Sequence, residues 1–260
     1  MKLSVIIPAF NEEDYLAATL EAIGAALADI DESEVIVVDN DSTDGTRAVA
    51  EGFDVRIVTE HEHNISQVRN TGGANATGDV LVFIDADTIV RSGLFEKIIN
   101  AMGDERCFGG SVAVEYTEAN RKWIRYYLMG WVFWGRVLKM RHGAAQFCRK
   151  GVFHELGGYD STIFMGEDIE FQWRLAKKAK ANGGREPPRQ PKRLPPLLRK
   201  EGSHSSGYTT FIEEPRVLTS SRRYSKMGLV KTLFLTHPIT ILLTWRVRTT
   251  WKDWYENAVR

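Results

Sequence analysis

The sequence predicts an α/β fold in which a mostly parallel central sheet is flanked by helices. Three observations predict it. Short runs of β-branched and aliphatic residues alternate with stretches whose apolar residues recur at helical spacing, as in parallel strands joined by crossover helices. The run from Val80 to Ile84 is apolar throughout, as in a strand buried on both faces. The chain of 260 residues is also long enough to bury a large core.

The first hundred residues contain four predicted strands with helices between them. We expect Pro8 to end the first strand, because proline lacks the N–H that a sheet ladder uses. We expect Asn11 to cap the following helix, with the acids of 12–14 in its first turn. The predicted strands are Leu3–Ile7, Val35–Val38, Val55–Val58 and Val80–Ile84, and the predicted helices lie at 11–27, after the polar turn 39–46, at 64–76 and around 94–99.

The rest of the chain is less regular. We expect a strand at 108–116, in which the pair Gly109-Gly110 marks a bulge or a close backbone approach. Further predicted elements are a short strand at 144–148, a helical turn at 152–156, a helix at 165–175 and one or two strand segments at 209–220.

The charges are unevenly distributed, although the formal net charge is zero. Residues 1–173 contain 15 Lys and Arg against 28 Asp and Glu, whereas residues 174–260 contain 19 against 6. A basic second part on an acidic body predicts contact with an anionic membrane surface or a nucleic acid. Two cysteines, Cys107 and Cys148, build no disulfide framework or Cys-rich zinc site, and packed thiols of a cytosolic protein are expected.

Two segments interleave aromatic and basic residues. Residues 119–141 are either an interfacial helix whose cations meet anionic headgroups or a core helix with cations at its rim. The tail 225–260 is either a membrane-surface segment or a C-terminal helix pair packed on the body, and no apolar run is long enough to span a membrane. Between them, residues 181–207 are rich in Pro, Gly and cations, which predicts a loop insertion.

Asp85 and Asp87 follow the buried run 80–84 with one residue between them. If the strand continues, their side chains point to the same side. Ligands bind open α/β sheets at the carboxyl ends of the strands, and two acids there repel unless a cation lies beside them. Mg²⁺ and Mn²⁺ suit such oxygen ligands. The alternative is a solvated loop after a strand.

Four stretches of the first half carry a resemblance to a known family: 4–13 (SVIIPAFNEE), 35–46 (VIVVDNDSTDGT), 69–79 (RNTGGANATGD) and 83–87 (FIDAD). Together, in this order and spacing, they resemble the inverting family 2 glycosyltransferases, which have the GT-A fold. No Gly-x-Gly-x-x-Gly or Walker motif follows the first strand, which argues against a dinucleotide site and a P-loop.

The resemblance implies a site for a UDP- or GDP-linked sugar. Asp39 would accept a hydrogen bond from the base, Asp41 and Arg69 would lie beside the base and ribose, Asp85 would reach the ribose or the waters of the metal, and Asp87 would ligate the metal. The other implied donor-site residues are Pro8, Ala9, Phe10, Glu12, Ala86, Arg222 and Arg223.

A second acidic pair, Glu167 and Asp168, opens the predicted helix 165–175. The resemblance implies that Asp168 is the catalytic base, whereas the alternative is that both acids only complement the helix N-terminus. Arg222 and Arg223 either reach the donor phosphates or form a solvated basic face. His204, in the loop insertion, is a further candidate metal ligand or phosphate contact, although a lone loop histidine is more often neither.

The predicted function is metal-dependent transfer of a sugar, with inversion, from a nucleoside diphosphate to a hydroxyl or phosphate group of a lipid-linked acceptor or a growing glycan. We expect a glycosyltransferase domain at 1–224, with a nucleotide-sugar half at 1–103 and an acceptor half at 104–224, and a helical tail at 225–260. The expected location is cytoplasmic, with peripheral contact to the inner face of the plasma membrane and no nucleic-acid partner. The alternatives are a non-catalytic nucleotide-sugar or membrane-surface binding module and a sugar nucleotidyltransferase. A nucleotidyltransferase would need a Gly-rich basic loop after the first strand, and none is present.

Overall fold

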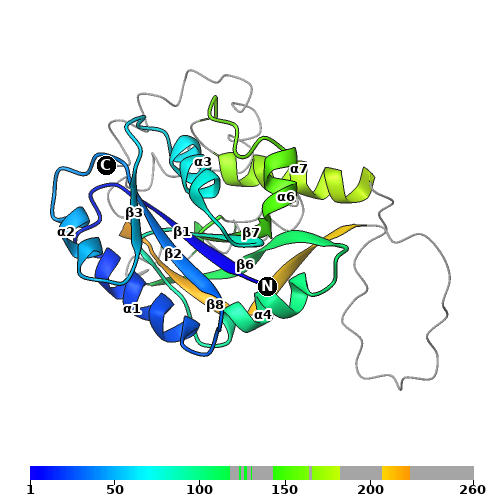
Figure 1. Ribbon diagram of the computed structural model, residues 1–260, viewed down its shortest axis with the longest axis horizontal. Coiled ribbons are helices and arrows are strands. Elements are labelled where there is room, and N and C mark those ends of the chain that lie inside the picture. Colours follow the sequence, from blue (N-terminus) through cyan, green and yellow to red (C-terminus); the bar gives the residue numbers. More distant parts are fainter. Residues whose placement is uncertain are drawn as a thin grey trace.

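The computed structural model describes residues 1–117, 143–163, 166–181 and 207–222, together with Trp123, Tyr126, Tyr127 and Gly130. These residues form one eight-stranded sheet with the order β3-β2-β1-β4-β7-β6-β8-β5, covered by helices on both faces (Figure 1). The strands are β1 (Leu3–Ala9), β2 (Ser33–Asp39), β3 (Arg56–Thr59), β4 (Val80–Ile84), β5 (Thr88–Ile89), β6 (Cys107–Thr117), β7 (Ala145–Arg149) and β8 (Tyr208–Ser220).

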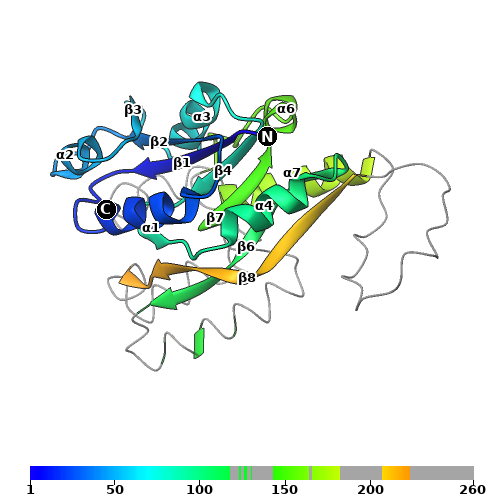
Figure 2. The ribbon, with the colours of Figure 1, turned by 60° about the horizontal axis from the view of Figure 1, so that its bottom comes forward.

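The sheet has a parallel part and a mixed part. Strands β3, β2, β1 and β4 are parallel, which confirms the arrangement predicted for the first half of the chain. Strand β7 then pairs antiparallel with both β4 and β6. The long strands β6 and β8 pair in parallel and extend together along one side of the molecule (Figure 2). The predicted α/β class is therefore confirmed, with a sheet that is mixed beyond β4.

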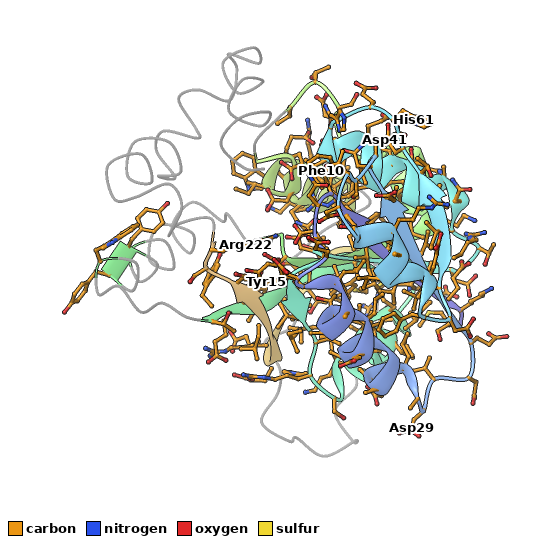
Figure 3. All side chains as sticks on the ribbon, turned by 90° about the vertical axis from the view of Figure 1, so that its left-hand side faces the viewer. Phe10, Tyr15, Asp29, Asp41, His61 and Arg222 are labelled. Atoms are coloured by element: carbon orange, nitrogen blue, oxygen red, sulfur yellow. The ribbon has the colours of Figure 1, made fainter. Side chains whose placement is uncertain are left out.

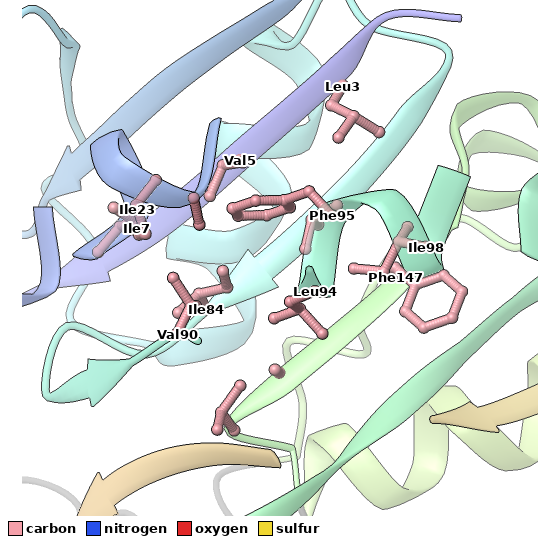
Figure 4. Close-up of a cluster of buried hydrophobic side chains, with 14 of the residues drawn as sticks. Leu3, Val5, Ile7, Ile23, Ile84, Val90, Leu94, Phe95, Ile98 and Phe147 are labelled. Carbon is pink, nitrogen blue, oxygen red and sulfur yellow. The ribbon is translucent and has the colours of Figure 1, made fainter. Parts of the chain in front are cut away.

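Helices α1 (Leu16–Leu27), α2 (Thr46–Glu51) and α4 (Leu94–Met102) cover one face of the sheet, and α3 (Ile65–Asn75), α6 (Lys150–Glu155) and α7 (Glu167–Ala181) cover the other. Successive residues of β1 and β4 alternate between two hydrophobic clusters, as the pleat requires. Figure 4 shows the cluster under α1 and α4, where Ile23 and Phe95 pack against side chains of β1.

Two predictions for the first loop are wrong. Strand β1 does not end at Pro8, because Pro8 still pairs with Val38 of β2. Pairing with β4 ends earlier, at Ile6, so the missing N–H of Pro8 interrupts no ladder on that side. Asn11 does not cap the helix either. It has φ +53°, its side chain accepts a hydrogen bond from the Thr43 backbone N–H at 2.8 Å, and α1 begins only at Leu16.

The predicted close approach at Gly109 and Gly110 is confirmed. The register of β6 against β8 shifts between Cys107 and Gly109. A Cβ on Gly109 would lie 2.3 Å from the Phe147 carbonyl oxygen, and one on Gly110 would lie 2.2 Å from that of Thr210. Only glycine lets β6 lie this close to both neighbouring strands, because any other side chain would clash.

Several predictions concern residues outside the described ranges: most of the aromatic and basic segment 119–141, the loop insertion at 181–207 apart from its two ends, and the tail 225–260. Within the described ranges, no helix combines the length and the apolar character that crossing a membrane would need. Cys107 and Cys148 are both buried, and burial raises the pKa of the Cys107 thiol to about 11.

Candidate functional site

The carboxyl ends of β1, β2 and β4 meet at one edge of the sheet, and most of the predicted site residues lie there. The Asn40 backbone N–H donates to the Ala9 carbonyl oxygen at 2.9 Å, which ties the end of β2 to the end of β1. Parallel strands place their carboxyl ends on one side, so this edge follows directly from the order of β2, β1 and β4.

Asp39 is the innermost acid on the β2 side of this edge, with 4% of its surface exposed. One carboxylate oxygen accepts from the Ser42 backbone N–H at 3.1 Å, and the other lies 3.8 Å from the Arg47 guanidinium. Asp41, at φ +54°, is more exposed and pairs with His61 at 2.8 Å, which raises the pKa of His61. Figure 3 shows Asp41 and His61 on the same side of the molecule as Phe10.

Asp85 and Asp87 do not continue strand β4. The strand ends at Ile84, and the Thr88 backbone N–H donates to the Asp85 carbonyl oxygen at 3.1 Å, so residues 85–87 form a turn. Different groups hold the two carboxylates. Asp85 accepts from Arg69 at 2.9 Å. Asp87 lies 3.4 Å from the Arg222 Nε and accepts from the Thr219 hydroxyl at 3.2 Å.

Glu12 and Arg222 join the first loop to the end of β8. The Arg222 guanidinium bonds to both carboxylate oxygens of Glu12 and lies 4.2 Å from the centre of the Tyr15 ring, so a cation–π contact holds it as well (Figure 3). Burial raises the pKa of Glu12 to about 7; Arg222 lowers it, and the charges of Asp87 and Asp85 raise it further. Asp85 and Asp87 are therefore close enough to Glu12 for their charges to affect its pKa.

The donor atoms at this edge fit a hard divalent cation. Mg²⁺ is usually held by one or two carboxylates and completes its shell with water and substrate phosphates. Asp85 and Asp87 offer two carboxylates on one turn. Asp85 already pairs with Arg69 and Asp87 with Arg222, so a cation bound there would share each acid with an arginine. Among the described residues there is no cluster of three or more Asp, Glu, His or Cys side chains arranged to hold a metal by themselves.

Arg69 connects this edge to the second acidic pair. It lies on α3, is 4% exposed, and donates to Glu167 at 2.7 Å as well as to Asp85 at 2.9 Å. Burial alone would lower the pKa of Arg69, but the charges of Asp85 and Glu167 outweigh it and the pKa is raised. Arg69 is thus a permanent buried cation between two carboxylates from distant parts of the chain.

Asp168 lies in the first turn of α7, next to Glu167. Burial raises the pKa of Asp168 to about 7, the negative charge of Glu167 adds to this effect, and Arg69 opposes it. Its Oδ1 accepts from the Ile169 backbone N–H at 2.8 Å. The other oxygen faces Gly143 so closely that a Cβ there would lie 2.3 Å from it. A carboxyl group with a pKa near 7 is suited to exchange protons near neutral pH.

The remaining predicted site residues divide into two groups. Pro8, Ala9 and Ala86 are buried, and the Ala86 carbonyl oxygen accepts from the Thr19 hydroxyl at 2.7 Å, so their side chains belong to the packed base of the site. Arg223 and His204 lie outside the described residues.

Some residues that contact the predicted site residues were not themselves predicted from the sequence: Tyr15, Arg47, His61, Gln146, Tyr159 and Thr219. Tyr159 lies in the GGYD stretch at 157–160, so a signal was present there, but a tyrosine after two glycines has no specific chemical meaning by itself. Gln146 and Thr219 are interior strand residues, and nothing in their local sequence distinguishes them from other polar strand positions.

Comparison of the structure with solved structures shows the same fold. S. aureus TarS in complex with UDP-GlcNAc superposes with a TM-score of 0.64 over 95% of this chain and 65% of that chain, at 14% identity. A mannosyltransferase from Pyrobaculum calidifontis, in complex with GDP-Man and Mn²⁺, superposes with a TM-score of 0.58 over 86% of this chain and 58% of that one, at 20% identity. Both likenesses establish the GT-A fold.

Sequence comparison identifies relatives and a family. The uncharacterized glycosyltransferase YfnE of Bacillus subtilis is 40% identical over 110 residues, which are 40% of this chain and 28% of YfnE. The glycosyltransferase AglE of Haloferax volcanii is 27% identical over 183 residues, or 66% of this chain and 60% of AglE. The chain thus spans less than two thirds of either relative. The model of Glycosyl transferase family 2 matches residues 4–157, more than half of the sequence, and the chain therefore belongs to this family.

Proposed function

We propose that the protein transfers a sugar from a nucleoside diphosphate sugar to an acceptor hydroxyl group, with inversion at the anomeric carbon. The observation that carries this proposal is Asp168, a carboxyl group with a pKa of about 7, joined through Glu167 and Arg69 to the edge where Asp85 and Asp87 lie. A proton acceptor next to an acidic strand edge is what such a transfer needs.

Asp168 acts as the general base in this proposal. It takes the proton of the acceptor hydroxyl while the acceptor oxygen attacks the anomeric carbon and the bond from that carbon to the diphosphate oxygen breaks. One displacement inverts the configuration and needs no protein nucleophile. Base catalysis of this kind contributes about 10²–10⁴-fold to a rate.

Arg222 and the acids of the turn at 85–87 bind the donor diphosphate in this proposal. Asp87, with Asp85 beside it, would hold Mg²⁺ or Mn²⁺, and the ion would neutralise negative charge that develops on the leaving diphosphate. Arg222 lies against Asp87 and can bind phosphate oxygens with two N–H groups at once. The Mn²⁺ and GDP-Man in the Pyrobaculum structure, and the UDP-GlcNAc in TarS, support a donor of this class.

We further propose that residues 1–103 bind the nucleotide, that residues 104–224 bind the acceptor, and that the acceptor is a glycan or a lipid-linked sugar met at a membrane surface. The excess of 19 Lys and Arg over 6 Asp and Glu after residue 173 supports contact with anionic lipids. Co-sedimentation with vesicles containing phosphatidylglycerol, at low and high salt, tests this part separately; no binding at low salt would exclude it.

A nucleotide-release assay tests the activity. The protein is incubated with UDP-glucose, UDP-GlcNAc or GDP-mannose and Mn²⁺, with lipid-linked and soluble acceptors, and free nucleoside diphosphate is measured. We expect release with one donor, its loss in Asp168→Asn and Asp87→Asn, and its retention in Asp29→Asn. Asp29 is a matched control, because it is exposed at the far end of α1 from Tyr15 (Figure 3).

Isothermal titration separates binding from turnover. Asp87→Asn is expected to lose the Mn²⁺-dependent part of donor affinity, whereas Asp168→Asn is expected to keep it. Donor binding by the unaltered protein without release under any condition would instead support a non-catalytic binding module. Full activity of Asp168→Asn would remove that residue from the mechanism.

A further inference from the structure

A chain of hydrogen bonds connects the interior of the protein to the backbone of Asp168. The Tyr159 hydroxyl donates to the Gln146 side-chain oxygen at 2.9 Å, and the Gln146 side-chain nitrogen donates to the Asp168 carbonyl oxygen at 3.1 Å. The carbonyl can only accept, so the orientation of the Gln146 amide is fixed by its partner. Gln146 is 1% exposed and Tyr159 is 2% exposed, so water does not compete for either contact.

Tyr159 is itself held rigidly. Its backbone N–H and carbonyl both pair with the Asn70 side chain of α3, at 2.7 and 2.9 Å. Its ring stacks on Phe171 of α7 with centroids 4.5 Å apart, and it meets Phe83 of β4 edge to face at 5.2 Å. The hydroxyl is therefore presented to Gln146 from a position fixed by α3, α7 and β4.

The Tyr159 ring also contacts Arg69, which binds Glu167, the residue next to Asp168. The Arg69 guanidinium is 5.3 Å from the ring centre and donates to Glu167. The first turn of α7 is thus held at two points, at the Glu167 side chain by Arg69 and at the Asp168 backbone by Gln146. Both supports rest on Tyr159.

We propose that Gln146 and Tyr159 are positioning residues for the transfer reaction, and that together they hold the first turn of α7 so that the Asp168 carboxylate faces the acceptor hydroxyl. This inference rests on the proposed function. Neither residue needs to touch substrate, since both act through the backbone of Asp168. Displacing a reacting group by about 1 Å can cost about 10²-fold in rate, so a rigid support of this kind affects turnover directly.

Three variants and one control test the proposal. Tyr159→Phe removes only the hydroxyl and keeps the stacked ring. Gln146→Leu removes both hydrogen bonds of the chain, and the double variant tests whether the Tyr159 hydroxyl acts only through Gln146. Gln172→Leu is the control. Gln172 lies on α7, one turn beyond Asp168, and it is also buried. Its side-chain nitrogen likewise donates to a backbone carbonyl, that of Gly110, at 3.0 Å.

The kinetic readout is release of nucleoside diphosphate from UDP-glucose, UDP-GlcNAc or GDP-mannose with Mn²⁺. It is measured with the lipid-linked and soluble acceptors of the activity assay and also without them, when water accepts the sugar. We expect kcat to fall about tenfold in Gln146→Leu and somewhat less in Tyr159→Phe, with the donor KM unchanged within about twofold. The double variant is expected to be no slower than Gln146→Leu, because the two residues act in series. Gln172→Leu is expected to lower the melting temperature by a similar amount and to keep its kcat.

Hydrogen exchange of the Ile169 amide gives a second readout that needs no turnover, since this amide donates to the Asp168 carboxylate. We expect faster exchange there in the Gln146 and Tyr159 variants than in Gln172→Leu. An unchanged kcat, or the same loss of kcat in Gln172→Leu, would overturn the proposal, as would unchanged exchange. Absence of release by the unaltered protein with every donor and acceptor would count against the proposed function instead, and the exchange experiment would still decide whether the support exists.

Discussion

Replacing the buried cation Arg69 by methionine is expected to destabilise the fold substantially. The pair with Glu167 is the larger loss, because the two side chains are only 5% and 12% exposed. Removing one partner of a buried ion pair costs about 3–5 kcal/mol, since it leaves an uncompensated charge. The Asp85 side chain is 35% exposed, so that pair adds at most about 1 kcal/mol. We therefore expect a loss of about 4 kcal/mol, a large part of the 5–15 kcal/mol typical of a native protein.

Urea unfolding followed by circular dichroism at pH 7.5 measures this loss, with Arg91→Met as the matched control. Arg91 pairs with Glu115 at 2.8 Å, but both side chains are more than 40% exposed, so its removal is expected to cost less than about 1 kcal/mol. The deficit of Arg69→Met is expected to narrow as the pH is lowered towards 5. Arg69 lowers the pKa of Asp168 by favouring its charged form, and this contribution is lost once Asp168 is protonated in both proteins. Equal losses in the two variants, or a deficit that grows on acidification, would refute the reasoning.

Three further predictions concern other parts of the site and core. Asp168→Asn is expected to raise the melting temperature at pH 8 and to raise it less at pH 5. Because the pKa of Asp168 is raised to about 7, the folded state binds its proton more tightly than the unfolded state, and wild-type stability falls as pH rises from about 4 to 7. Equal shifts in calorimetry at both pH values would contradict this. Gly72→Ala is expected to cost about 1–3 kcal/mol, since its Cβ would lie 2.3 Å from the Ile6 Cγ2, whereas Gly24→Ala, with open space around it, should gain about 0.5–1 kcal/mol in the same urea titration. Arg222→Met is expected to raise the donor KM at least about tenfold with a smaller effect on kcat, and an unchanged KM would separate Arg222 from donor binding.

Local pattern predicted the parallel part of the sheet well. Strand β4 was predicted with its observed limits, Val80 and Ile84, because a short, uninterrupted apolar run is typical of a strand buried on both faces. The glycine pair at 109–110 was read correctly for a similar reason. Where the prediction failed, a partner distant in sequence had decided the local structure. Asn11 is a good helix cap by composition, but its side chain is engaged by the loop that contains Thr43.

The site shows the same limit. Asp85 and Asp87 could be named from their place after a buried strand, and the other acids, together with Arg69 and Arg222, from the family resemblance. Which acid each arginine contacts could not be predicted. Arg222 contacts Glu12, which lies 210 residues earlier in the sequence. Gln146 contacts Asp168 from β7, and no local sequence pattern predicts that β7 lies antiparallel between β4 and β6. A residue's neighbours in sequence specify its secondary structure more strongly than its contacts in a mixed sheet.

The late position of Arg222 has a consequence for how this protein is made. During synthesis the ribosome releases Glu12, Asp85 and Asp87 long before it reaches β8, so the nascent chain carries these three acids without the arginine that lies between two of them. The parallel strands can already pair at that stage, because all four precede residue 85. The edge at which we propose that the donor binds is therefore complete only after translation has passed β8, the final described strand.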